Sequence, residues 1–165
     1  MGKSQVSHLI KDGYKVFVWN RTKAKADEAV AAGATWCESA ADLAKACNYV
    51  IMMVGGPKDV EQMAFCPKTG LFSGFQENTF LIDHTSSSPA LAKRMATELK
   101  ENKKVTVIDA PVSGGDVGAK AGNLVVMAGG EEKAIHHCKP LMETYSQNVM
   151  YMGAAGQGQH TKMAN

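Results

Sequence analysis

The sequence predicts an α/β fold in which a doubly wound parallel sheet is covered by helices on both faces. Segments typical of strands alternate with segments typical of helices, and the connections between them are short. Tyr49–Val54 is apolar throughout, as in a strand buried on both faces of a sheet. The 165 residues amount to one domain, without an internal repeat or a low-complexity linker.

The first third of the chain predicts two helices and two strands. Lys3–Lys11 has apolar residues at helical spacing, and Gly13 follows its end. Tyr14–Trp19 is rich in residues that favour strands. Lys23–Ala32 is an Ala/Lys/Glu-rich segment that predicts a second helix, and Ala34–Cys37 predicts a short strand.

The middle of the chain repeats the pattern. Ser39 is a predicted cap for a helix over Ala40–Cys47. After the apolar strand, Gly55-Gly56-Pro57 breaks the chain, and Lys58–Ala64 predicts a helix. Thr79–Ile82 predicts the next strand.

The last part of the chain adds helices and strands of the same kinds. Ser88 and Pro89 open a predicted helix that ends near Asn102, since proline suits the first helical position. The remaining predicted elements are the strands Val105–Ile108, Leu124–Met127 and Asn148–Tyr151, and a helix over Glu131–Tyr145 that is interrupted or restarted at Pro140.

Composition argues against several classes of partner. The net charge is +2 and the lysines are scattered, so we expect no nucleic-acid and no membrane partner. No apolar stretch approaches the ~20 residues of a membrane span. The four cysteines are far apart and form no C-x-x-C pair, which predicts reduced thiols and no zinc site. We expect a cytoplasmic protein, or one of an organelle matrix if a targeting peptide precedes the sequence.

Two motifs carry the functional signal. Asp109–Gly115 reads Asp-Ala-Pro-Val-Ser-Gly-Gly and follows a predicted strand. Its glycines and Ser113 leave backbone N–H groups and a hydroxyl free for an anionic group, although an ordinary surface turn is the alternative. Gly153–Asn165 is a glycine-rich turn that runs into a helix with Lys162 and Asn165 three positions apart.

Together these motifs resemble the β-hydroxyacid dehydrogenase family, which includes 3-hydroxyisobutyrate dehydrogenases, tartronate semialdehyde reductases, glyoxylate/succinic semialdehyde reductases and 6-phosphogluconate dehydrogenase. The resemblance covers essentially the whole chain. It implies a Rossmann-like dinucleotide-binding domain over residues 1–152, and the start of an inter-domain helix with the catalytic lysine over residues 153–165. It also implies that the first strand and the C-terminal helical domain are lacking, so we expect a fragment that is inactive alone.

The resemblance assigns Gly2 to the last glycine of a G-x-G-x-x-G fingerprint whose earlier part would precede Met1. The alternative is an initiator methionine followed by glycine. The strand that precedes such a fingerprint is normally central in the sheet. Without it, Tyr14–Trp19 and Tyr49–Val54 would each lack a neighbour.

The residues after the second strand of the implied fold predict the cofactor. This position holds Asn20-Arg21-Thr22 and no carboxylate. A carboxylate would repel a 2′-phosphate, whereas a guanidinium pairs with it in bidentate fashion. We therefore predict NADP(H), with Arg21 as the main contact and Asn20 and Thr22 assisting. The alternative is an exposed loop arginine and a threonine helix cap.

The resemblance assigns three more cofactor contacts: Met53 and Val54 at a strand end, and Thr85 beside the nicotinamide ribose. Thr85 could instead cap a helix. His84 stands where the family commonly has serine. We interpret it as a polar residue at a strand end rather than a catalytic group.

The implied chemistry needs a proton donor and acceptor at the reacting oxygen, and Lys162 matches the family's catalytic lysine. Because burial favours the neutral amine, we expect Lys162 to be buried beside the cofactor. Asn165 would donate to the substrate oxygen, and Ser113, Gly114 and Gly115 would bind the substrate carboxylate. The alternative is a solvated helix face.

We predict an NADP-dependent oxidoreductase that acts on a small β-hydroxyacid or its semialdehyde, and expect the full-length protein to be a homo-oligomer. Asp116 and Lys120 are interpreted as surface residues that complete the loop after Gly115. The alternative function is a non-catalytic Rossmann-fold module that acts as a scaffold.

Overall fold

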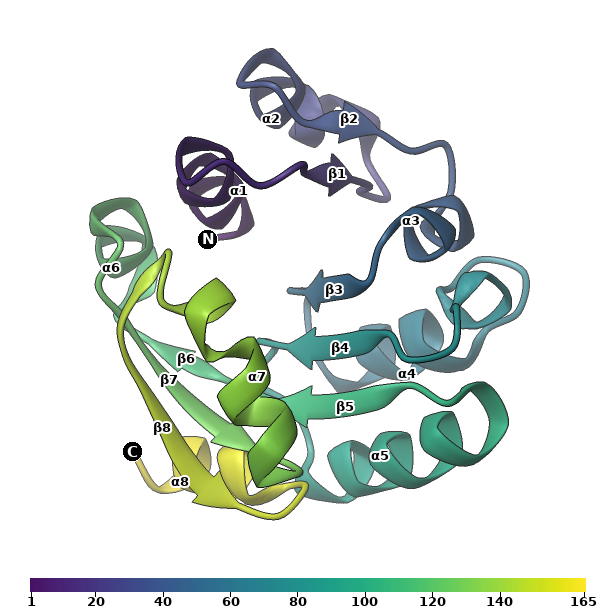
Figure 1. Ribbon diagram of the computed structural model, residues 1–165, viewed down its shortest axis with the longest axis vertical. Helices are drawn as coiled ribbons and strands as arrows, with labels where there is room; N and C mark the ends of the chain where they lie inside the picture. The colour runs from purple at the N-terminus through teal and green to yellow at the C-terminus, as the bar shows by residue number, and fades with distance from the viewer.

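The computed structural model describes the chain from Met1 to Asn165 and contains a six-stranded main sheet (Figure 1). Its strand order is β3-β4-β5-β7-β6, and β8 pairs with β7 on a separate branch. The strands are β3 (Tyr49–Met52), β4 (Phe80–Asp83), β5 (Thr106–Asp109), β6 (Val112–Ser113), β7 (Leu124–Gly129) and β8 (Ser146–Gly153).

The sheet is mostly parallel, which agrees with the predicted fold class, but one strand departs from it. The pairs β3·β4, β4·β5 and β7·β8 are parallel, whereas β7 runs antiparallel to β5 and to β6. The reversal occurs between β6 and β7, where residues 114–123 turn the chain back beside β6. The antiparallel direction of β7 is a departure from the predicted parallel sheet.

A separate two-stranded sheet holds β1 (Phe17–Val18) and β2 (Thr35–Trp36). It lies above β3 in Figure 1, and β1 forms no ladder with β3. Each of β1 and β3 therefore has a single strand partner, as the sequence led us to expect. Both strands are shorter than predicted, and Tyr49 at the start of β3 is partly exposed while its ring stacks on Phe80 and His137.

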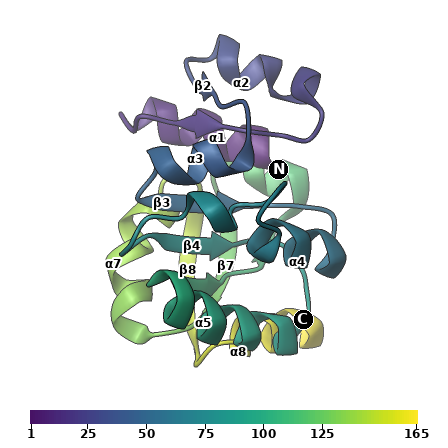
Figure 2. The same ribbon diagram turned by 90° about the vertical axis from the view of Figure 1, so that its right-hand side faces the viewer.

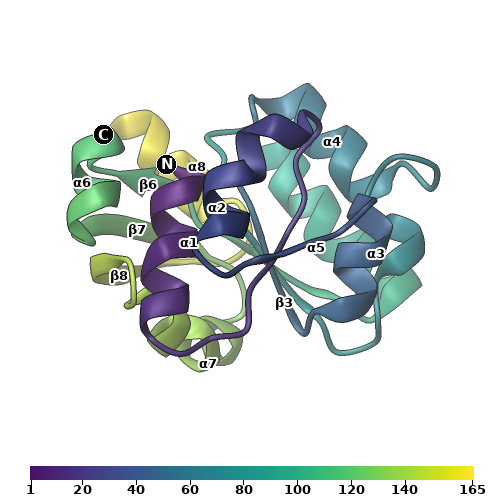
Figure 3. The same ribbon diagram turned by 90° about the horizontal axis from the view of Figure 1, so that it is seen from above.

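Helices cover both faces of the main sheet (Figure 3). They are α1 (Gly2–Lys11), α2 (Asp27–Ala31), α3 (Ala40–Ala46), α4 (Pro57–Phe65), α5 (Pro89–Lys103), α6 (Gly115–Ala121), α7 (Glu132–Met142) and α8 (Gln157–Ala164). One apolar cluster joins α7 to β7, with Ile135 and Leu124 among its members. A second joins α3, α4 and α5 to β3, β4 and β5, and a third, of four buried residues, packs α2 and the 3₁₀ turn before it on β1. Figure 2 shows α4 and α7 on opposite sides of the strands.

Local sequence explains where two helices begin. The Ser39 hydroxyl accepts a hydrogen bond from the Asp42 amide at 3.0 Å and caps α3. Ser88 caps α5 in the same way through Leu91 at 3.3 Å, and Pro89 occupies the first turn. The predicted cap at Ser39 and the predicted helix start at Ser88 and Pro89 are confirmed.

Three predicted elements were wrong in detail. Lys23–Ala32 is divided into a 3₁₀ turn, η1 (Lys23–Ala26), and α2, and Thr22 makes no side-chain cap that would start a regular helix. Helix α7 continues through Pro140, whose ring lies on the exposed side while Cys138 and Met142 hold the other side in the core.

Asp116 and Lys120 belong to α6 and not to a loop. The helix was missed because its glycine-rich sequence is typical of a turn. Gly118 and Ala119 are buried in it, and a Cβ at Gly118 would already lie 3.4 Å from the Leu124 side chain. Close packing on β7 therefore stabilises a helix that its own propensity disfavours.

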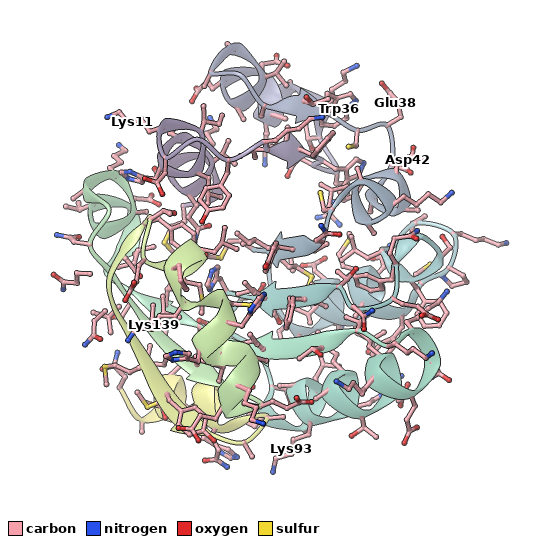
Figure 4. All side chains as sticks on the ribbon, in the orientation of Figure 1. Lys11, Trp36, Glu38, Asp42, Lys93 and Lys139 are labelled. Carbon is pink, nitrogen blue, oxygen red and sulfur yellow. The ribbon has the colours of Figure 1, made fainter.

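No helix of the chain is long and apolar enough to cross a membrane. All four cysteines are free. Labelled lysines lie at separate points of the periphery in Figure 4, among them Lys11, Lys93 and Lys139. This scattered arrangement agrees with the absence of a basic run in the sequence.

Candidate functional site

Most of the predicted site residues lie where β3, β4, β5 and β6 end, and Gly2, Asn20, Arg21 and Thr22 lie elsewhere. Neighbouring parallel strands present their carboxyl ends at one edge of the sheet, which is where open α/β sheets bind ligands. Asp83 and Asp109 are the last residues of β4 and β5 and lie opposite each other in register. The Val54 amide, just after β3, donates to the Thr85 hydroxyl at 3.0 Å. Thr85 thus ties two strand ends together and does not cap α5.

Asp109 joins the two sequence motifs directly. Its carboxylate accepts a hydrogen bond from the Gly156 amide at 2.8 Å and another from the Gln159 amide at 3.0 Å. These N–H groups belong to the start of α8, where a negative charge is favourable. The first residue of one motif therefore fixes the helix of the other.

The glycines of the second motif permit this close approach. A Cβ at Gly158 would lie 2.5 Å from the Asp109 carbonyl oxygen and closer still to that of Met127. A Cβ at Gly129, on β7, would lie 2.7 Å from the Gly158 amide nitrogen. The Gly-x-Gly pattern of Gly156 and Gly158 therefore allows α8 to pack directly against the ends of β5 and β7.

The two buried carboxyl groups have altered acidity. Burial raises the pKa of Asp83 to about 7, and the amide of Thr85, at 3.0 Å, opposes part of that rise. Burial also raises the pKa of Asp109, although its N–H partners in α8 favour the charged form. A carboxyl that titrates near neutrality lies beside Thr85.

Lys162 and Ser113 are brought together. The Lys162 ammonium donates to the Val112 carbonyl oxygen at 2.9 Å, and Ser113 is the next residue of β6. Lys162 is half-buried rather than fully buried as expected. Asn165 is exposed one turn later, so α8 presents both residues from one end of the helix.

The glycines after Ser113 adopt the backbone that the turn requires. Gly114 and Gly115 have φ values of +129° and +59°, which L side chains rarely adopt. Both are exposed and lead into α6, and Ser113 is half-buried. The Ser113 hydroxyl and the backbone N–H groups of Gly114 and Gly115 are therefore accessible to a small anionic ligand near the Lys162 ammonium.

A cavity of about 560 Å³ opens beside Lys162, where α8 faces the starts of α4 and α5. Its walls are polar at the α5 side, with Ser86, Ser87 and Ser88, and the remaining lining residues are Pro57, Pro89, Gln159, Lys162 and Met163. The volume suits a small molecule or part of a larger one.

The residues that the sequence assigns to the 2′-phosphate of the cofactor form a second group. Arg21 follows β1, its side chain is 78% exposed, and its guanidinium lies 3.5 Å from the Asp59 carboxylate in α4. Asn20 donates to the Thr22 carbonyl at 2.8 Å, so it shapes the turn that presents Arg21. Gly2 lies apart from this group, in the first turn of α1.

His84 is a buried structural residue. Its ring is 1% exposed and contacts the Ala110 carbonyl at 2.5 Å and the Tyr145 hydroxyl at 2.8 Å. Burial lowers the pKa of His84 to about 4, so the ring is neutral at pH 7. A neutral ring donates from Nδ1 to the carbonyl and accepts at Nε2 from Tyr145. These contacts leave no ring nitrogen for a substrate, in agreement with our interpretation.

Sequence reasoning missed Gln159. Its side-chain amide is buried and bonds to the loop that carries Thr85, as described below. A single glutamine inside a helix has no signature that distinguishes it from a surface residue. Its position between Gly158 and Lys162 was the only available signal.

Comparison with known proteins finds relatives that are described as oxidoreductases or dehydrogenases. An uncharacterized oxidoreductase of Bacillus subtilis, YkwC, is 46% identical over the whole chain, which covers 57% of that protein. A probable 3-hydroxyisobutyrate dehydrogenase-like protein of Arabidopsis thaliana, described as mitochondrial, is 42% identical, and the chain covers 49% of it. The chain thus spans about half the length of the curated relatives it matches.

A solved structure of Mycobacterium tuberculosis 3-hydroxyisobutyrate dehydrogenase with L-serine superposes with a TM-score of 0.92 at 30% identity. The match covers the whole chain and 55% of that structure. A family model described as the NAD binding domain of 6-phosphogluconate dehydrogenase matches residues 1–153. With its strand-end site and its mostly parallel sheet, the chain belongs to this family of NAD(P)-binding domains.

Proposed function

We propose that this chain is the cofactor-binding part of an NADP-dependent oxidoreductase that acts on a small β-hydroxyacid or the corresponding semialdehyde. The observation that carries the proposal is the contact of the Lys162 ammonium with the Val112 carbonyl, next to Ser113. It brings the helix of one motif to the glycine-rich turn of the other. Residues far apart in sequence thereby form one cationic, hydrogen-bonding site for a carboxylate.

The residues present fit NADP(H) at both ends of the proposed site. The exposed guanidinium of Arg21 suits a 2′-phosphate, which would replace the Asp59 carboxylate as its partner, and the turn after β1 itself holds no carboxylate. At the other end, Met53, Val54 and Thr85 lie where β3 and β4 finish. When bound, the cofactor would supply hydride chemistry, which no side chain of the chain can provide.

The chain's own residues would bind and orient the substrate and move one proton. The Lys162 Nζ would hold the proton that the substrate oxygen gains on reduction and loses on oxidation. Asn165 would donate a hydrogen bond to the same oxygen. Ser113, Gly114 and Gly115 would bind the substrate carboxylate through the hydroxyl and backbone N–H groups.

We also propose that the complete protein is a homo-oligomer. The support is the apolar surface beside the site, where Val117 is 81% exposed and Met163 is 72% exposed. Apolar side chains that flank a polar site are typical of surfaces covered by further protein.

Spectroscopic measurement of NADPH oxidation tests the enzymatic proposal. The polypeptide encoded by the complete gene is assayed with glyoxylate, succinic semialdehyde, methylmalonate semialdehyde and tartronate semialdehyde. We expect turnover with at least one of them and a lower rate with NADH. Binding of NADPH without turnover of any substrate would instead favour the non-catalytic scaffold.

A further inference from the structure

Gln159 connects α8 to the loop between β4 and α5 through both ends of its side chain. Its Oε1 accepts a hydrogen bond from the Ser87 amide at 2.8 Å, and its Nε2 donates to the Thr85 carbonyl at 2.7 Å. Gln159 itself is 1% exposed. Its backbone amide is the group that bonds to Asp109. The residue therefore bonds to the β4–α5 loop through its side chain and to the end of β5 through its backbone.

The two segments that Gln159 joins carry different parts of the proposed site. Thr85, on the loop, bonds to Val54 and belongs to the cofactor side. Lys162 is one turn beyond Gln159 on α8 and belongs to the substrate side. Gln159, Ser87 and Lys162 all line the same cavity. No other side chain forms hydrogen bonds from α8 to the β4–α5 loop.

We propose that Gln159 is a positioning residue that fixes Lys162 relative to Thr85, and so aligns the proton-transfer group with the cofactor side of the site. The inference deepens the proposed function and rests on it for the catalytic consequence. Reacting groups need near-contact alignment, and small displacements reduce rates strongly. Gln159 contributes by geometry and takes no part in proton transfer.

The two hydrogen bonds of the Gln159 side chain require an amide, because one needs a donor and the other an acceptor. The Thr85 carbonyl needs a donor and the Ser87 amide needs an acceptor, and a glutamine amide supplies both. In Gln159→Met, similar volume is kept but both buried backbone groups lose their partner. In Gln159→Glu, the acceptor for Ser87 is kept but a carboxylate faces the Thr85 carbonyl. That change also places a charge at a position that is 1% exposed.

The chain offers a matched control. Gln157 lies in the same helix, is half-buried, and makes no side-chain hydrogen bond. Gln157→Met therefore makes the same chemical change on α8 without removing the connection. Any effect shared by both methionine variants would reflect the helix as a whole rather than the connection.

The test uses the polypeptide encoded by the complete gene and combines amide hydrogen exchange with kinetics. In Gln159→Met we expect exchange at the Ser87 amide to accelerate at least about tenfold, while amides of β4 and β5 keep their rates. With the substrate that supports turnover, kcat should fall about tenfold or more while the Kd for NADPH changes less than about threefold. Gln159→Glu should also lower kcat but keep part of the Ser87 protection.

An unchanged exchange rate at the Ser87 amide in Gln159→Met would overturn the proposal. An equal acceleration of that exchange in Gln157→Met would overturn it as well. So would an unchanged kcat together with lost protection, because the connection would then have no catalytic consequence. The exchange measurement needs no turnover. Absence of turnover in the unaltered protein therefore contradicts the proposed function, and the catalytic role of Gln159 with it, while exchange still decides whether the connection exists.

Discussion

At the scale of single residues, buried polar groups define the geometry of the site. The Asp109 carboxylate accepts hydrogen bonds from two N–H groups at the start of α8. The Gln159 side chain donates one hydrogen bond to the β4–α5 loop and accepts another from it. Lys162 completes the set through the Val112 carbonyl. Each of these contacts joins residues at least 47 positions apart in sequence. They explain why the two motifs occur together in one chain.

The ion pair of Arg21 and Asp59 predicts how cofactor preference responds to charge. Arg21→Asp should weaken NADPH binding far more than NADH binding, because a carboxylate repels the 2′-phosphate. Asp59→Asn should strengthen NADPH binding by about two- to fivefold, since an exposed partner that competes for the guanidinium is removed. Fluorescence titration of both cofactors measures these changes. Equal losses of NADPH and NADH binding in Arg21→Asp would remove Arg21 from the phosphate site.

The buried carboxyl of Asp83 predicts a pH dependence of stability. Its pKa is about 7 in the folded chain against an ordinary value of 3.8, so the folded state binds the extra proton between these pH values. The stability that this group contributes is complete below pH 3.8 and is lost as the pH rises through 7.

Asp83→Asn removes that titration but keeps an oxygen for the Thr85 amide. Thermal unfolding at pH 5 and pH 8 should therefore show the variant gaining Tm relative to the unaltered protein at the higher pH. His84 acts in the opposite direction, because its lowered pKa makes acid destabilising, but it is common to both proteins and cancels in the difference. A Tm difference independent of pH would show that Asp83 is ionised throughout the range.

At the scale of elements, the docking of α8 depends on its glycines rather than on helix propensity. Helix α8 is short and has little apolar surface, with Gly158 and Gln159 as its buried residues. Its position comes from close backbone contact with the ends of β5 and β7 and from the Asp109 carboxylate. A helix held in this way tolerates no added atom at the contact.

Gly158→Ala tests that docking. The added Cβ would lie within 2.5 Å of the Asp109 carbonyl, so α8 must shift, and we expect a loss of about 1–3 kcal/mol in the free energy of unfolding. Gly56→Ala is the matched control, because a Cβ there meets nothing within 4 Å and the backbone φ is extended. Urea unfolding of both variants gives the comparison. Equal stability of the two variants would contradict close docking.

Elements with local signals were predictable and those set by tertiary contacts were not. Ser39 and Ser88 indicate where their helices begin, because a helix cap depends on residues within a few positions of each other in sequence. Helix α6 was missed because packing on Leu124 overrides the turn-like Gly115 and Gly118. The connection from Gln159 to Ser87 was also beyond reach, since it joins residues 72 positions apart.

At the scale of the whole molecule, the fold divides the site into two ends. Thr85 and Ser113 lie at strand ends of the main sheet and Lys162 reaches them from α8, whereas Arg21 follows β1 in the separate two-stranded sheet. Strands β1 and β3 form no ladder with each other, and each pairs with a single strand. The alignment of the two ends depends on how α3, which connects β2 to β3, packs between the two sheets, and sequence patterns do not encode that packing.

The most direct test of the account is the turnover of Lys162→Ala beside its affinity for NADPH, in the polypeptide encoded by the complete gene. We expect kcat to fall by about 10² to 10⁴, because the proton donor is removed, while the Kd for NADPH stays within about twofold. Lys120→Ala, on the exposed side of α6, serves as the control and should keep full activity. A Lys162→Ala variant that retains its rate would contradict the central claim that this lysine carries the proton.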